Sequence, residues 1–156
     1  MLHYERTVET KEPAGSRRIE IFSPKIKRRL TLFSWHIHDA WLLLEGDPTV
    51  RPFCERAAYI DGEAGRVLDF WVDHGSGRAK FLVVSKEEAD AKSLPPSARG
   101  AKLQVLRRPD MIAFARHIEN WAQIVPYRTS FMRHADRRLQ NDLFARLEKP
   151  QRLERN

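Results

Sequence analysis

The chain has 156 residues, of which 42% are hydrophobic and 31% are charged, a balance that is ordinary for a globular protein of one domain. No apolar run approaches the roughly 20 residues needed to cross a bilayer, and the N-terminal segment lacks the apolar centre of a signal peptide. A single cysteine, Cys54, excludes an internal disulfide and a cysteine-based zinc site. We therefore expect a cytoplasmic protein with no membrane partner.

The net charge is +7, and the cationic residues concentrate at the two ends of the chain. Residues 1–34 hold 8 Lys/Arg against 4 Asp/Glu, residues 35–106 hold 9 against 11, and residues 107–156 hold 11 against 6. Basic ends around a slightly acidic centre favour a protein whose ends grip phosphate and whose centre holds a metal or a reacting group. Lys and Arg side chains that only solvate the surface would give the same counts.

The first part of the chain is predicted as a short strand followed by a helix. Apolar and polar residues alternate over 17–22 and stop at a turn, which predicts a strand. Apolar residues then recur at helical spacing over 36–46, and Gly46 stands where a helix commonly ends. The apolar face of this helix comprises Ile37, Trp41 and Leu44.

Three strands are predicted to follow the helix. The segment 49–60 contains Pro52, which favours an edge strand or an irregular approach to one, because proline cannot donate to a sheet ladder. Strands at 66–72 and 79–85 are separated by a short turn rich in glycine, which predicts a hairpin.

The rest of the chain is predicted to be mostly helical. A short helix is expected at 86–94, then a strand at 102–108. A helical stripe of apolar residues over 110–125 predicts a helix that Pro126 ends, and a last helix is expected at roughly 128–148.

The predicted hairpin brings Asp69 and Lys86 to neighbouring strand ends. A carboxylate there supplies a metal ligand, and a lysine supplies a charge that orients water or offsets the negative charge of a phosphoryl transition state. This arrangement resembles the PD-(D/E)xK nucleases, in which a second acid stands two residues before the lysine. The segments "LDF" (68–70) and "VSK" (84–86) fit the spacing, but Val84 takes the place of the second acid.

Motifs on both sides of the hairpin extend the resemblance. They are "SPK" with a basic turn at 23–29, "LLEGDPTVRPF" at 43–53, "ERA" at 55–57 where the family has "EQP", then "LDF" and "VSK". In this order they resemble, over roughly residues 17–90, the N-terminal domain of the TnsA endonucleases, heteromeric transposase subunits that cut the 5′ strands of a transposon.

The resemblance implies the fold and the domain organisation. It implies a mixed α/β (α+β) sheet in a restriction-endonuclease-like core over residues 1–106, which includes a basic N-terminal arm. A basic helical extension of the same domain would follow over residues 107–156.

Two positions depart from the family pattern. Counted back from Glu45 in the "LLE" motif, the catalytic glutamate of the helix falls on Ile37, and the acid before the lysine falls on Val84. The candidate catalytic residues that remain are Asp69 and Lys86.

The departures weaken the expected metal site. Because Mg²⁺ normally takes one or two carboxylates beside water and phosphate oxygens, a lone Asp69 would hold it weakly. Glu55, just before Asp69 in the motif order, is a candidate second metal ligand. His36, His38 and Asp39 flank the missing glutamate but suit a magnesium site less well.

Basic residues near both ends are the candidate contacts to nucleic acid: Lys25, Lys27, Arg28, Arg29, Arg133, Arg137 and Arg138. We expect a TnsA-like subunit with a degenerate nuclease centre that binds double-stranded DNA at transposon ends and contacts a transposase or another transposition protein. Two alternatives stay open. One is an active Mg²⁺-dependent DNA endonuclease, and the other is a non-catalytic basic module in which Asp69 and Lys86 form only a structural ion pair.

Overall fold

The computed structural model describes residues 6–60, 66–75, 78–85, 97–98 and 101–134, and this part of the chain has an α/β fold with two sheets and three helices. The elements in chain order are β1 (Ile19–Ser23), β2 (Arg28–Leu32), α1 (Trp35–Gly46), β3 (Phe53–Tyr59), β4 (Val67–Asp73), β5 (Ala79–Ser85), β6 (Ser97–Ala98), β7 (Ala101–Arg107), α3 (Arg108–Ala113) and α4 (Ala115–His134). A membrane-spanning helix, which needs both length and apolar character, does not occur in these ranges.

The larger sheet has the strand order β3-β4-β5-β7-β6. Strands β3, β4 and β5 pair antiparallel, and β7 adds to β5 in parallel. The predicted antiparallel pairing of the strands at 66–72 and 79–85 is confirmed, and both strands lie inside the sheet. Strand β3, which follows Pro52, lies at the edge, as the proline predicted.

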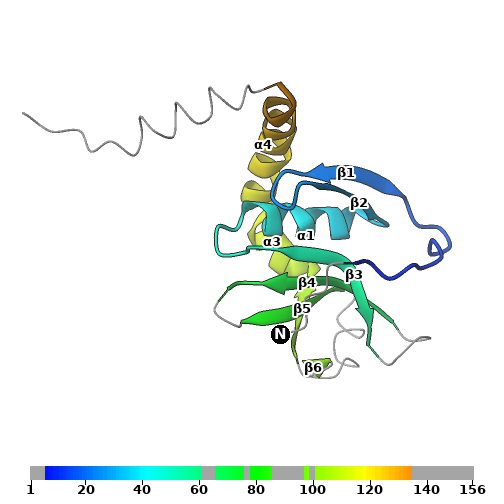
Figure 1. Cartoon of the computed structure of the whole chain (residues 1–156). Helices are drawn as coiled ribbons and strands as arrows, with labels where there is room; N and C mark the ends of the chain where they lie inside the picture. The colour runs from blue at the N-terminus through cyan, green and yellow to red at the C-terminus, as the bar shows by residue number, and fades with distance from the viewer. Residues whose placement is uncertain (1–5, 61–65, 76–77, 86–96, 99–100, 135–156) are drawn as a thin grey trace, which may run out of the picture.

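Helix α1 lies between the β1–β2 hairpin and the larger sheet, as Figure 1 shows. The main core fills this space, because apolar side chains from the helix, the hairpin and one sheet face meet there. Its members include Leu30, Leu32, Trp41, Leu42, Phe53, Phe70, Val72, Leu82 and Leu106. A second cluster lies on the other sheet face and includes Leu68, Trp71, Phe81 and Val83.

The "SPK" and "LLEGDP" segments contact each other through the buried carboxylate of Glu45. The Ser23 hydroxyl donates to Glu45 Oε2 at 2.6 Å, and the Lys25 backbone N–H donates to Oε1 at 2.7 Å. The Lys25 ammonium donates to the carbonyls of Leu44 and Asp47 at 2.7 and 2.6 Å. These bonds fix the β1–β2 turn to the end of α1, so both motifs have a structural explanation.

The sequence-based element boundaries need three corrections. The single helix predicted over 110–125 is divided at Phe114 into α3 and α4. Strand β2 was not predicted, and Pro126 does not end a helix, because α4 runs through it from Ala115 to His134. A separate helix starting at 128 is therefore wrong. An interior proline costs about 3 kcal/mol; α4 packs on α1 through the buried Val125 and the partly buried Ile118 and Trp121, which work against this cost.

Side-chain contacts next to Pro126 stabilise the helix around it. The Thr129 hydroxyl donates to the Val125 carbonyl at 2.9 Å, and Val125 is buried in the main core. The predicted helix at 86–94 and everything predicted beyond residue 134 lie outside the described residues.

Candidate functional site

Strands β4 and β5 separate at one end of their ladder. The paired residues run from Asp73↔Ala79 to Phe70↔Leu82, and a continued register would set Leu68 opposite Val84. Instead, the Val84 backbone N–H donates to Asp69 Oδ2 at 2.7 Å. The carboxylate thus replaces a backbone acceptor where the strands diverge, and we call this point, defined by Asp69 and Val84, the fork.

Two adjoining cavities of about 270 and 360 Å³ open at the fork. Four residues line both cavities: Pro13, Phe33, Ile37 and Asp69. Val84 lines the larger one. Residues from α1, β4 and β5 that the nuclease-like pattern singled out, Ile37, Asp69 and Val84, therefore surround one space.

Lys86, the other predicted catalytic residue, lies outside the described residues. It follows directly after β5, which ends at Ser85. Among the site positions that the structure describes, only Asp69 carries an ionisable group, because Ile37 and Val84 are apolar.

The environment of Asp69 favours its neutral form. Burial raises the pKa of Asp69 to about 6, although the hydrogen bond from Val84 and the charge of Arg66 act in the opposite direction. Desolvation penalises a carboxylate more than a carboxylic acid, which explains the direction of the shift. Asp69 therefore titrates near pH 6, well above an ordinary aspartate.

Glu55, the candidate second metal ligand, lines the smaller cavity with Asp69 but is already paired. The Arg28 guanidinium donates to both of its oxygens, from Nη1 to Oε1 at 2.9 Å and from Nη2 to Oε2 at 2.6 Å. The Glu55 side chain is 3% exposed, so a metal ion would have to displace a buried bidentate ion pair. The hydrogen bond to Glu55 also raises the pKa of Arg28.

The polar residues around Ile37 point in different directions. His36 lines the larger cavity at the fork. His38 instead contacts the rings of Trp35 and Trp41, and its Nδ1 lies 3.4 Å from Asp39 Oδ1. Across the described ranges, no three His, Cys, Asp or Glu side chains form a group that could hold a metal ion.

The structure adds cationic residues that the motifs did not single out. Lys11 and Arg56 line the smaller cavity, and Arg66 lines the larger one. Arg56 has a backbone φ of 46° at an irregularity of β3 between Glu55 and Ala58. The only sequence signal was the "ERA" segment, which puts Arg56 beside Glu55.

The predicted nucleic-acid contacts fall into three groups. Lys25 and Arg28 are half-buried and hold Leu44, Asp47 and Glu55 within the fold. Lys27 and Arg29 are exposed at the β1–β2 hairpin. The side chain of Arg133, and all of Arg137 and Arg138, lie outside what the structure describes.

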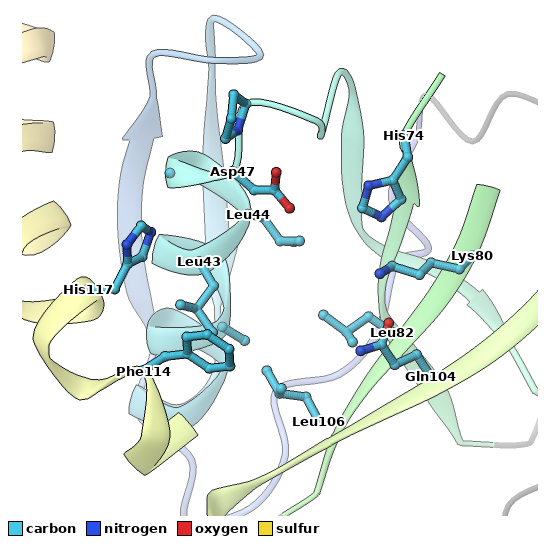
Figure 2. Close-up of a pocket in the computed structure, with 13 residues that line it drawn as sticks. Leu43, Leu44, Asp47, His74, Lys80, Leu82, Gln104, Leu106, Phe114 and His117 are labelled. Atoms are coloured by element: carbon cyan, nitrogen blue, oxygen red, sulfur yellow. The ribbon is translucent and has the colours of Figure 1, made fainter. Parts of the chain in front are cut away.

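A further cavity of about 370 Å³ lies between α1 and the sheet, where Asp47, His74 and Lys80 gather at one end of an apolar space, as Figure 2 shows. Burial lowers the pKa of both His74 and Lys80. Its apolar walls include Leu43, Leu44, Leu82, Leu106 and Phe114. None of the predicted site residues that the structure describes lines this cavity, so the fork remains the candidate site.

Comparison with known proteins gave no match to a family model, to a curated protein or to a solved structure.

Proposed function

We propose that the chain is a TnsA-like subunit of a transposition system, which binds double-stranded DNA and carries a degenerate nuclease centre. The observation that supports this function is the meeting of Ile37, Asp69 and Val84 around one cavity at the fork. These residues come from three elements and are far apart in the sequence, yet the motif order had assigned all three to one site. Two of them are apolar and offer no metal ligand, which argues against metal-dependent DNA cleavage.

The residues at the fork do not fit a magnesium ion. Mg²⁺ takes oxygen ligands in near-octahedral geometry, whereas Ile37 and Val84 offer no side-chain oxygen. Among the described residues that line the cavities, the other acid is Glu55, and both of its oxygens are bound by Arg28. We derive no metal-dependent step from this arrangement, and the active endonuclease stays the weaker alternative.

A transposase or another transposition protein is the proposed partner. The segment from α3 to α4 carries several large apolar side chains that are exposed to solvent, and exposed apolar side chains can contribute to a protein contact. They are Ile112, Phe114, Ile124, Tyr127 and Phe131.

The first experiment compares DNA binding with DNA cleavage. We expect the purified chain to bind a short labelled duplex at low salt and to leave supercoiled plasmid intact with Mg²⁺ or Mn²⁺. Loss of a metal-stabilised transition state lowers the rate by about a thousandfold or more, which a nicking assay resolves. Metal-dependent nicking that disappears in Asp69→Ala would make the endonuclease the better account.

A second experiment restores the missing acids. Ile37→Glu places a carboxylate beside Asp69, at the cost of an apolar contact between Ile37 and the main core. Together with Val84→Asp it should create a Mn²⁺ site that isothermal titration detects and that Asp69→Asn removes in the same background. A doubly substituted chain that folds but binds no Mn²⁺ would argue against a nuclease-like arrangement at the fork.

A further inference from the structure

The two cavities at the fork carry an excess of positive charge. Lys11, Arg56 and Arg66 line them, against Asp69 as the one acid that is not already paired with a cation among the described lining residues. Glu55 also lines the smaller cavity, but Arg28 neutralises it. With Lys11, Arg56 and Arg66 charged, the local balance favours an anion even when Asp69 is ionised.

Two buried polar atoms in the lining have no hydrogen-bond partner within the described part of the chain. They are Arg56 Nε, beside the smaller cavity, and Ser16 Oγ, beside the larger one. Leaving a buried donor unsatisfied costs about 1–3 kcal/mol, so each atom is available to a group bound in the cavity. Both groups can donate to an oxyanion.

The backbone of Arg56 is held in a conformation that arginine seldom adopts. Its φ of 46° lies in the left-handed region, where a residue with a Cβ is disfavoured. The Val8 N–H donates to the Arg56 carbonyl at 2.8 Å and ties the N-terminal segment to this point. The same segment supplies Lys11 and Ser16, so the unusual backbone and the wall of the cavity belong to one arrangement.

The start of α1 adds a third favourable feature. The N-cap Ser34 and His36 line the larger cavity, and the first turn of this helix contains no acidic residue. Backbone N–H groups and the dipole at a helix N-terminus favour a bound anion.

We propose that the cavities at the fork bind a phosphate group directly, without a metal ion, through Arg56, Arg66 and Lys11, with Ser16 as a neutral donor. This inference rests on the proposed function only for the source of the phosphate, which is then the DNA backbone. Phosphate binding would take the place of the metal site that Ile37 and Val84 no longer form.

Asp69 opposes the anion and makes its binding sensitive to pH. The ionisable groups that face Asp69 across the cavities are Lys11 from the N-terminal segment, His36 from α1, Glu55 and Arg56 from β3, and Arg66. A bound anion favours protonated Asp69, so binding should tighten as the pH falls through about 6. Sulfate is the suitable anion for measuring this pH dependence, because its charge stays constant around pH 6.

The test titrates inorganic phosphate into the full chain at pH 8 with a chelator present, followed by calorimetry. Arg66→Gln and Arg56→Gly should each weaken binding about tenfold, the scale of one lost charge-assisted contact. Glycine adopts a positive φ readily, so Arg56→Gly removes the guanidinium without straining the backbone. Arg78→Gln removes an exposed arginine outside both cavities and should leave phosphate affinity unchanged.

Asp69→Asn should change the anion affinity in the opposite direction, because it removes a negative charge from the cavities. It should tighten phosphate and sulfate binding several-fold at pH 8 and flatten the pH dependence of sulfate binding. Undetectable phosphate binding, or equal affinity in the parent chain, Arg66→Gln and Arg56→Gly, would overturn the proposal. Binding of Mn²⁺ in phosphate-free buffer that Asp69→Asn removes would also overturn it.

Duplex DNA measured on the same variants identifies the source of the phosphate. Parallel weakening of duplex and phosphate binding assigns the fork to the DNA backbone. Weaker phosphate binding with unchanged duplex binding instead assigns it to a free phosphate ester, while the proposed DNA-binding function stands. A chain that binds phosphate at the fork but binds no duplex would reject the proposed function alone.

Discussion

Asp69 has two roles that compete with each other. Its carboxylate accepts the Val84 N–H at 2.7 Å and so closes the ladder where β4 and β5 separate. It also lines both cavities at the fork, where burial raises its pKa to about 6. The ionised form is therefore less stable in the folded protein than in water, and its retention at neutral pH is a cost that favours a functional role.

Replacement of Asp69 by asparagine should stabilise the fold in a pH-dependent way. Folding raises the pKa of this acid from 3.8 to about 6, so its penalty is absent below pH about 4, grows through pH 6 and is complete above it. Two pKa units correspond to about 3 kcal/mol as an upper bound. We expect Asp69→Asn to gain about 1–3 kcal/mol at pH 8 and clearly less at pH 5. Urea unfolding at both pH values measures the gain, and an equal gain at both would contradict the shifted pKa.

Some of the site was readable from the sequence and some was not. Motif spacing assigned Ile37, Asp69 and Val84 to one site, and all three line the larger cavity. Arg56 and Ser16 were missed because their position depends on an irregular strand and on the N-terminal segment, which leave no periodic signal in the sequence. The pairing of Glu55 with Arg28, 27 residues earlier in the chain, was also missed, because patterns of neighbouring residues carry no information about such distant contacts.

At the scale of the elements, apolar periodicity predicted most of the large sheet. The helix over 36–46 and the strands at 66–72 and 79–85 were confirmed within a residue at each end, because their buried faces follow the expected periods. Strand β2 was missed, since it opens with two arginines and gains its buried face only through pairing with β1. The prediction that Pro126 ends a helix was wrong, because the packing of α4 on α1 outweighs the low helix propensity of proline.

The contact between α1 and the β1–β2 turn depends on the buried carboxylate of Glu45. Glu45→Ala leaves the Ser23 hydroxyl and the Lys25 N–H without their acceptor, so we expect a loss of about 2–4 kcal/mol. Glu20→Ala is the matched control. Glu20 is exposed, and within the described part of the chain its ion pair is with the exposed Arg18, so its loss should be under about 1 kcal/mol. Similar losses in both variants, measured by urea unfolding, would mean that the buried hydrogen bonds contribute little.

Helix α4 packs closely against Gly46 at the end of α1. A Cβ on Gly46 would lie 2.3 Å from Trp121 Nε1 and 2.7 Å from His117 Nε2. Helix propensity favours Gly46→Ala by up to about 1 kcal/mol, whereas overpacking costs about 1–3 kcal/mol, so we expect a net loss of stability.

A double-mutant cycle separates the two effects at Gly46. In the Trp121→Leu background the clash with Trp121 is relieved while the contact with His117 remains, so Gly46→Ala should be clearly less destabilising than in the parent chain. Thermal unfolding of the four chains gives the coupling. An unchanged loss in the Trp121→Leu background would exclude the contact with Trp121 as its cause.

At the scale of the whole molecule, the basic residues fall into two groups: some form hydrogen bonds within the fold, and others are exposed at the surface. The four cations of the β1–β2 hairpin at 25–29 show both kinds. Lys25 and Arg28 bond to α1 and β3, while Lys27 and Arg29 are exposed. The net charge of +7 therefore overstates the charge that is free to meet phosphate, and DNA binding should depend on which cations are removed.

The double variant Lys27→Gln with Arg29→Gln tests this dependence. Each lost phosphate contact should flatten the slope of log affinity against log salt by about 0.9, so the pair should flatten it by up to about 1.8. The matched control is Arg78→Gln with Lys102→Gln, which lowers the net charge equally at two other exposed positions. Fluorescence anisotropy with a labelled duplex over a salt series gives both slopes. If the control flattens the slope as much as the test pair, binding follows total charge, and the β1–β2 hairpin is not a DNA contact.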